Sequence, residues 1–288
     1  MDFRNGRESR NVEDRRGQGG HHLGGRGKIG IGTLVLVLVA MYFGIDPSVV
    51  LDTATVVQPP AIESSQPGVP RSAAEDELAR FMSMVLADTE DTWGPIFQSA
   101  GRQYQEPKLV LYTGATRSAC GVGQAQMGPF YCPADGKVYL DLSFFDDLHR
   151  RFGAPGDFAQ AYVIAHEVGH HVQNLLGISD KVQQARQRLS EREANQLSVR
   201  LELQADCLAG VWAYHADRTR QVLEQGDVDE ALRAATAIGD DRIQKQAQGY
   251  AVPDSFTHGS AAQRVRWFRV GLEHGDLRAC DTFSVAAL

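Results

Sequence analysis

The stretch Ala165-His166-Glu167-Val168-Gly169-His170-His171 decides the fold of the second half of this chain. Residues four apart share one face of a helix, so His166 and His170 can direct their imidazole nitrogens at a single metal ion. Glu167 lies about 100° round the same helix, within reach of a water on that ion. Apolar residues just before the stretch give the helix a buried side, where histidine and glutamate are costly without a partner. The stretch therefore predicts a buried helix that binds zinc.

A catalytic zinc needs a third protein ligand and an open position for water. Glu202 is favoured because it lies in an apolar helical stretch, where a divalent ion removes the cost of a buried carboxylate. Asp206 follows one turn later and is predicted to accept the other N–H of His166. An exposed acidic face is the alternative interpretation of this pair. The other candidates after the first motif, all less favourable in geometry or surroundings, are His171, Glu191, Glu193 and His215.

These residues predict a hydrolytic enzyme with one zinc ion. Zinc lowers the pKa of its water, and Glu167 can take the released proton and pass it to a leaving amine. The predicted reaction is hydrolysis of a peptide or protein substrate. The alternative is an inactive zinc-binding scaffold tethered to a membrane, and the presence of Glu167 favours the enzyme.

The apolar pattern around these motifs predicts a mainly helical α+β domain. Ser72-Ala73-Ala74-Glu75 is a capping box that opens the first helix, near the expected start of the domain, residues 71–288. A small antiparallel sheet is expected from residues 109–112, 130–132 and 138–142, the last two joined by a turn at Asp135-Gly136. The later helices are expected at residues 158–176, 180–216 with a candidate break at Ser190, 229–248 and 261–272.

The first 70 residues predict a membrane anchor. Residues 29–45 form an uncharged apolar run at the short end of what spans a bilayer, preceded by a basic leader, residues 1–28, that is expected to be disordered. A Pro/Ser-rich linker, residues 46–70, follows. The basic leader favours a cytoplasmic N-terminus, which would place the remainder in the periplasm on a bacterial inner membrane. A cleaved signal peptide is the alternative.

The charge and the cysteines agree with that topology. The formal net charge is -7, so a nucleic-acid partner is not expected. Four cysteines in an oxidising compartment favour two disulfides. Of the three possible pairings, loop closure favours Cys120 with Cys132 and Cys207 with Cys280.

Several further strings accompany the two motifs and carry a resemblance to a known family. They are Cys120-Gly121, residues 128–133, residues 138–142 and Thr257-His258-Gly259-Ser260, the last followed by Arg264. With them, residues 71–283 resemble the bacterial "putative neutral zinc metallopeptidase" family, whose domain has gluzincin-like active-site helices. The resemblance implies a zincin-like fold and zinc-dependent peptidase activity.

The zincin precedent also implies roles for residues outside the two motifs. An extended peptide would add backbone hydrogen bonds to the strand formed by Val138, Tyr139, Leu140, Asp141 and Leu142. His258 resembles a position that steadies the oxyanion of a tetrahedral intermediate, and Tyr250 is a second candidate. A turn residue that caps the helix from Ala261 explains His258 equally well.

Overall fold

The computed structural model describes residues 1–3, 6–17 and 72–288. The predicted anchor at residues 29–45 and the linker at 46–70 lie outside the described residues. Among the described helices, none combines the length and apolar character needed to cross a membrane. Residues 1–16 and 71–288 form one compact unit.

The sheet has four strands in the order β1-β2-β6-β5. Its central strands are β2 (Lys108–Tyr112) and β6 (Lys137–Asp141), which pair in parallel. β5 (Phe130–Cys132) forms the predicted antiparallel hairpin with β6. The expected antiparallel sheet is thus confirmed for this hairpin only. The other two pairings, β1 with β2 and β2 with β6, are parallel. Between β2 and β5 the chain forms a separate hairpin, β3 (Ala115–Ser118) with β4 (Gly121–Gln124).

The first strand, β1 (Val12–Asp14), pairs in parallel with β2 and differs from the expected disordered leader. Glu13 accepts a hydrogen bond from Lys137 Nζ at 2.8 Å, and Arg16 pairs with Asp76 across to the first long helix. The three residues of β1, two of them acidic, have no pattern that predicts a strand. The strand is therefore identified only by its pairing with β2 and its contacts with Lys137 and Asp76. Because β1 and β2 pair, they must lie on the same side of any membrane.

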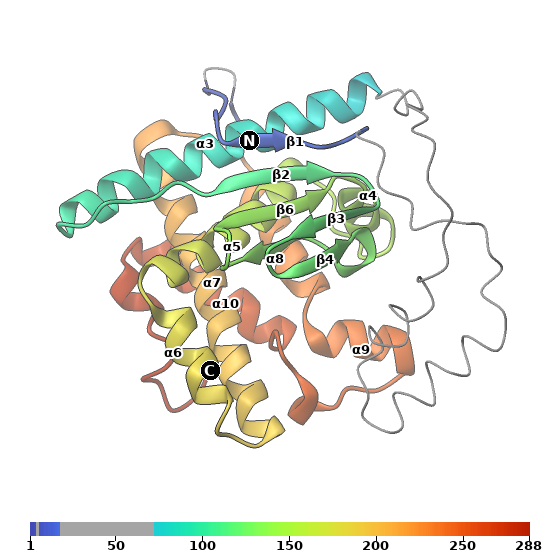
Figure 1. The fold of residues 1–288 in the computed structure, drawn as a ribbon, viewed down its shortest axis with the longest axis vertical. Coiled ribbons are helices and arrows are strands. Elements are labelled where there is room, and N and C mark those ends of the chain that lie inside the picture. Colours follow the sequence, from blue (N-terminus) through green and yellow to red (C-terminus); the bar gives the residue numbers. More distant parts are fainter. Residues whose placement is uncertain (4–5, 18–71) are drawn as a thin grey trace, which may run out of the picture. The chain divides into compact units, whose positions relative to one another are not determined.

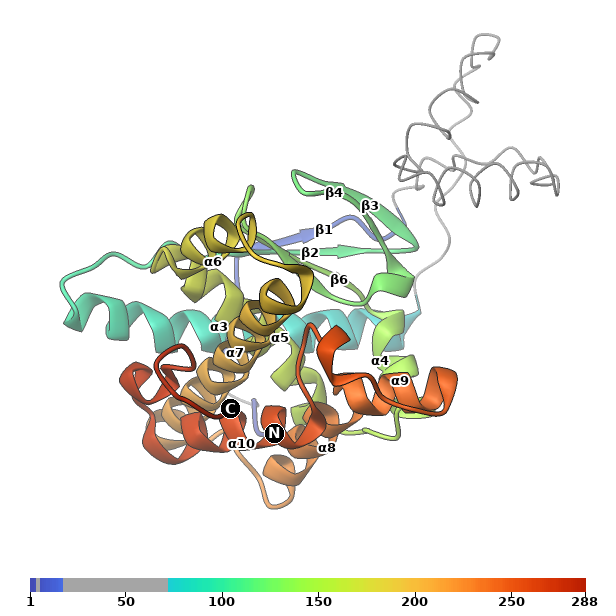
Figure 2. The ribbon, with the colours of Figure 1, turned by 90° about the horizontal axis from the view of Figure 1, so that it is seen from below.

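Helices cover one face of the sheet, as Figures 1 and 2 show. α3 (Ala73–Ser99) begins at the predicted Ser72 capping box and contacts β2. Below it lie α5 (Asp157–Leu175), α7 (Glu191–Arg220) and α10 (Ala261–His274). Alternate strand residues, including Leu109 and Leu140, are fully buried in the main core with these helices. The opposite sheet face packs Tyr112 and Tyr139 with Cys132.

The helix boundaries follow the sequence closely, with one additional break. Residues 180–216 separate at the expected Ser190 cap into α6 (Ile178–Arg186) and α7. Residues 229–248 were expected as one helix but form α8 (Asp227–Ala237) and α9 (Asp240–Gln248). A Cβ at the intervening Gly239 would lie 2.4 Å from the Ala261 nitrogen, so this close approach requires glycine. The unpredicted short elements are α4 (Ser143–Arg150), η1 (Ala125–Met127), η2 (Pro253–Ser255) and η3 (Leu277–Cys280).

Close helix crossings and two disulfides fix the elements that bear the motifs. A Cβ at Gly169 of α5 would lie 2.9 Å from the Ala205 carbonyl oxygen of α7, so the two helices cross almost backbone to backbone. Both predicted disulfides are confirmed. Cys120 bonds to Cys132 at the end of β5, and Cys207 bonds to Cys280. The second disulfide ties the C-terminal segment to α7 directly after Asp206.

Candidate metal centre

Two helices bring three potential metal ligands together. His166 and His170 lie one turn apart on α5, and Glu202 faces them from α7. His166 Nε2 is 3.2 Å from Glu202 Oε2, and His170 Nε2 is 3.4 Å from Glu202 Oε1. The three side chains offer ligand atoms that all lie within 4.8 Å of one another. The structure therefore assembles the predicted triad.

The other ring nitrogen of each histidine meets an oxygen acceptor. His166 Nδ1 donates to Asp206 Oδ1 over 2.9 Å, as the sequence predicted. His170 Nδ1 donates to Gln173 Oε1 over 2.8 Å, and the Gln173 amide in turn donates to the Leu201 carbonyl. These bonds orient both rings so that the Nε2 atom of each faces Glu202. Sequence reasoning missed Gln173, although its place three residues after His170 on the helix was available as a signal.

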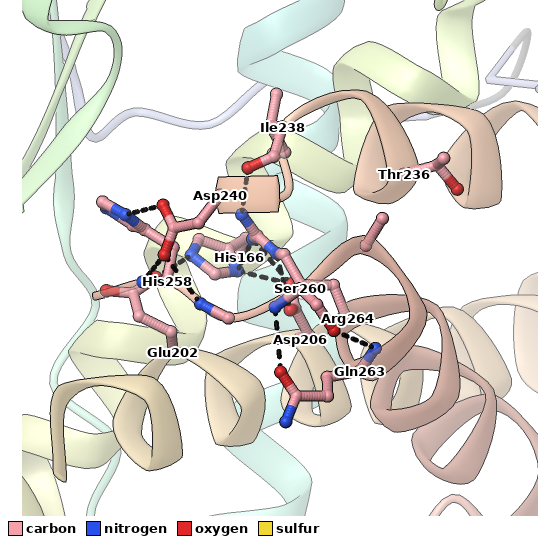
Figure 3. A network of polar contacts seen from close by, with 12 residues as sticks. His166, Glu202, Asp206, Thr236, Ile238, Asp240, His258, Ser260, Gln263 and Arg264 are labelled. Atoms are coloured by element: carbon pink, nitrogen blue, oxygen red, sulfur yellow. Dashed lines mark hydrogen bonds and ion pairs between the residues drawn. The ribbon is translucent and has the colours of Figure 1, made fainter. Parts of the chain in front are cut away.

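A buried network holds Asp206 in place (Figure 3). Arg264 of α10 donates to both carboxylate oxygens of Asp206 at 2.9 Å, and Tyr162 donates to Asp206 Oδ1. Arg264 is 2% exposed and Asp206 is fully buried, so water cannot solvate either charge. The ion pair compensates both charges instead. Arg264 belongs to the motif strings of the sequence, but no role was assigned to it. Its part emerges only from the packing of α10 against α7.

The charges of the site favour a bound cation. Burial alone raises the pKa of Glu202, but the neighbouring His170 and His166 hold it well below its usual value. Burial lowers the pKa of His166, yet Asp206 and Glu202 together raise it to about 10. Without a metal, protonated histidine thus balances the buried carboxylates. A divalent cation at the same place would supply that positive charge.

The donor set fits zinc in chemistry and spacing. Two imidazole nitrogens and one carboxylate form a catalytic zinc set that leaves a fourth position open. In a tetrahedron with bonds of about 2.0–2.1 Å, two ligand atoms lie roughly 3.3–3.4 Å apart. His166 Nε2 and His170 Nε2 lie 3.2 and 3.4 Å from different oxygens of the Glu202 carboxylate, close to that spacing. The three side chains are therefore near enough to one another to share one ion.

Glu167 lies beside these ligands and is not committed to a structural contact. Its side chain lines the same cavity of about 760 Å³ as His166, His170 and Glu202. Only 8% of its surface is exposed, and its carboxylate forms no hydrogen bond with the residues that the structure describes. A buried carboxylate that faces a cavity and lacks a partner is free to accept a proton from a molecule bound there.

The edge of this cavity is β5 and not the strand that the sequence predicted. β6 pairs with β2 along one side, and its residues Lys137, Val138 and Tyr139 pair with β5 along the other. Val138, Tyr139 and Leu140 are buried, and Asp141 is bound to the Gly114 N–H. Val138 and Tyr139 are therefore unavailable to a substrate strand because their backbone is paired on both sides, whereas Leu140 and Asp141 pair with β2 alone and Leu142 lies beyond the strand. Sheet order, which sequence did not reveal, makes β5 the edge strand, and its Phe130 and Tyr131 line the cavity.

His171 has the structural role that its place on the helix suggested. It points away from the ligand face, and its ring contacts Tyr131 Oη at 3.0 Å and the Gln105 carbonyl. Asn174 also donates to Tyr131 Oη. Burial lowers the pKa of His171, consistent with a neutral ring. These contacts attach α5 to β5 and so fix the strand edge relative to the ligands.

The structure separates the two further candidates, His258 and Tyr250. His258 lines the cavity, and its Nδ1 contacts Asp240 Oδ1 at 3.2 Å (Figure 3). Asp240 Oδ2 also accepts the backbone N–H groups of Thr257, His258 and Gly259, so one carboxylate holds the whole turn. The hydrogen bond that His258 donates to Asp240 raises the pKa of His258. Tyr250 is 62% exposed and does not line the cavity, so the structure does not bring it to the site.

Comparisons with known proteins give a family and relatives of nearly full length. The model of the family described as "Putative neutral zinc metallopeptidase" matches residues 1–283. The uncharacterized protein YpfJ of Escherichia coli (strain K12) is 55% identical over 290 residues, which cover 98% of this chain and 99% of YpfJ. The uncharacterized protein Mb2605 of Mycobacterium bovis is 42% identical over 264 residues, 86% of each chain. No solved structure matches this chain. The family match starts at residue 1, well before the expected residue 71, and so includes β1.

Proposed function

Because this chain belongs to the "Putative neutral zinc metallopeptidase" family, we propose that it is a zinc-dependent peptidase in which Glu167 is the general base. The observation that carries the proposal is the convergence of His166, His170 and Glu202 beside an unpartnered Glu167 in one cavity. Structural ion pairs would use all of these groups. Here Glu167 forms no hydrogen bond or ion pair with the residues that the structure describes, and it lines the same cavity as the three potential ligands.

Each step of the proposed hydrolysis has a residue placed for it. A bound zinc ion would supply a Lewis acid, which polarises the scissile carbonyl and acidifies water. Glu167 removes a proton from the attacking water and returns it to the nitrogen of the departing amine. In its protonated form, which the hydrogen bond to Asp240 favours, His258 donates a hydrogen bond to the oxyanion. Asp206 and Gln173 hold the two imidazole rings in position throughout.

The substrate is proposed to bind as an extended chain along the free edge of β5. β5 is the last strand of the sheet, so its outward backbone N–H and C=O groups can pair with an added strand. Phe130 and Tyr131 of this strand line the cavity that contains Glu167. A peptide paired with β5 therefore passes over the catalytic residues.

We propose an extracytoplasmic location for the folded unit, supported by its two disulfides. The pairing of β1 with β2 demands that residues 12–14 share that location. A single crossing by residues 29–45 would separate the two strands, so the anchor topology expected from the sequence and this pairing exclude each other.

The test of the proposed function is zinc analysis of the full-length protein and cleavage of a peptide library with and without a chelator. Glu167→Gln should keep bound zinc and lose hydrolysis, because an amide oxygen does not take up the proton of water at neutral pH. Glu193→Gln is the control, since this exposed acid only caps the start of α7. Zinc binding without any chelator-sensitive cleavage by the unaltered protein would favour the inactive scaffold. Full turnover by Glu167→Gln would refute the general base.

A further inference from the structure

A second cavity, of about 640 Å³, lies next to the proposed active site. We call it the arginine groove, after Arg151, Arg233, Arg242 and Arg269 in its lining. These four residues come from four places in the sequence: Arg151 follows α4, and the others lie on α8, α9 and α10. The protein as a whole carries a net charge of -7, so composition does not explain why four cations meet in one groove.

Most of the positive charge in the groove is uncompensated. Asp229 is the single acid in the lining. Within the described part of the chain, the guanidinium groups of Arg233, Arg242 and Arg269 form no ion pair or hydrogen bond, and all three side chains are exposed. Arg151 pairs with Asp147 at 3.3 Å, with both side chains more than half exposed. Three neighbouring cations without counter-charges repel one another and attract an anion.

The groove adjoins the cavity that contains Glu167. Arg151 and Phe152 line both cavities, and α9 borders both through Ile243 on one side and Arg242 on the other. The two cavities are therefore neighbours, and a polypeptide that extends from the catalytic cavity past Phe152 would come close to the arginine groove. The apolar residues Leu232 and Val265 of the arginine groove can contact the aliphatic part of a bound side chain.

We propose that the arginine groove binds acidic side chains of the polypeptide substrate, on one side of the bond that is cleaved. This inference rests on the proposed peptidase function and names its substrate class, a segment rich in Asp or Glu. Carboxylates suit guanidinium groups because the planar fork of arginine donates two parallel hydrogen bonds to them. Phosphate groups have similar chemistry, but adjacency to the peptide cavity favours an occupant that belongs to the same chain as the scissile bond.

The first test measures binding and does not depend on catalysis. Fluorescein-labelled hexaglutamate and hexaglutamine are titrated against the zinc-loaded full-length protein carrying Glu167→Gln, with fluorescence anisotropy as the readout. We expect hexaglutamate to bind about tenfold more tightly, with a preference that fades as salt is added. The triple change Arg233→Gln, Arg242→Gln and Arg269→Gln should abolish this preference. The control triple Arg188→Gln, Arg218→Gln and Arg266→Gln removes the same charge from exposed arginines outside both cavities and should preserve it.

The second test uses cleavage by the protein without the Glu167 change. For a library peptide that is cut, a version extended by three glutamates is compared with one extended by three glutamines. The groove triple should lower kcat/KM for the acidic version about tenfold, with little effect on the neutral version. If no peptide is cut at all, the peptidase proposal fails while the anisotropy result still decides the groove.

Two results would overturn the inference. One is equal binding of the two probes, or an equal loss of the preference for hexaglutamate in the groove and control triples. The second of these outcomes would mean that the preference depends only on the net charge of the protein. The other is groove-dependent binding to phosphatidylglycerol vesicles without any preference for hexaglutamate, which would assign the groove to phosphate headgroups.

Discussion

Replacement of Asp206 by asparagine should weaken zinc binding and the fold through separate contacts. The amide keeps the shape of the carboxylate but loses its charge, so His166 Nδ1 faces a poorer acceptor. Loss of such a partner costs about 10–100-fold in metal affinity, or roughly 1.4–2.7 kcal/mol. Arg264, 2% exposed, would also lose the charge of the buried carboxylate with which it forms an ion pair. An uncompensated buried charge of this kind costs about 3–5 kcal/mol of folding stability.

A second change separates the two effects. In the double variant Asp206→Asn with Arg264→Met, no buried charge is left unpaired, and an apolar side chain fills most of the arginine volume. Buried ion pairs replaced in this way are often neutral in stability. Most of the lost stability should therefore return, while the zinc affinity stays low because His166 still lacks its carboxylate partner.

Asp88→Asn provides a matched control at a distance from the site. Asp88 is also buried, and it accepts hydrogen bonds from Trp212 Nε1 and from Arg220, away from the cavity residues. This variant should lose stability and keep its zinc affinity. Stability is measured by urea unfolding of the metal-free protein, and zinc affinity by competition with a chromophoric chelator. If Asp206→Asn binds zinc as tightly as the unaltered protein, or no more weakly than Asp88→Asn, the assigned role of Asp206 is wrong.

Three other predictions concern the third ligand, the oxyanion residue and the membrane. Glu202→Ala should lose tight zinc and activity together, whereas His215→Ala should keep both, since His215 contacts the Gly275 carbonyl; the reverse pattern in zinc analysis would exclude the proposed ligand set. His258 has a raised pKa in the folded state, so the stability that it adds is present below about pH 6.5 and is lost as the pH rises through the folded pKa. Activity should fall over the same rise, and His258→Gln should lower kcat about 100-fold and flatten that part of the pH profile; an unchanged profile would leave His258 a turn residue. A cysteine placed at Arg10 should react with an impermeant maleimide on the side where a C-terminal alkaline phosphatase is active, whereas labelling from the opposite side would mean that β1 does not pair with β2 in the cell.

The candidate site could be predicted from the sequence because each of its two motifs lies within a single helix. His166, Glu167 and His170 are fixed relative to one another by a single helix, and their spacing alone places them. Glu202 and Asp206 repeat that logic on a second apolar helix. The capping boxes, the turn at Asp135-Gly136 and the four cysteines are also short-range signals.

The structure was needed wherever two distant segments meet. The position of β6 inside the sheet depends on pairing with β2 and β5 at once, so the sequence could not show that its backbone was unavailable to a substrate. The sequence of β1 has no periodic pattern that predicts a strand. β1 forms a strand because it pairs with residues 109–111 of β2. The split at Gly239 depends on contact with Ala261, 22 residues later.

The sequence by itself therefore determined the candidate metal ligands and the candidate proton carrier, since helix geometry relates neighbours a turn apart without any knowledge of the fold. Only the tertiary structure decided what surrounds them. Arg264 beneath Asp206, Asp240 behind His258 and the four arginines beside the cavity are brought together by helix packing. The sequence does not show that these residues are close in space, because burial and charge compensation depend on contacts between segments that are far apart along the chain.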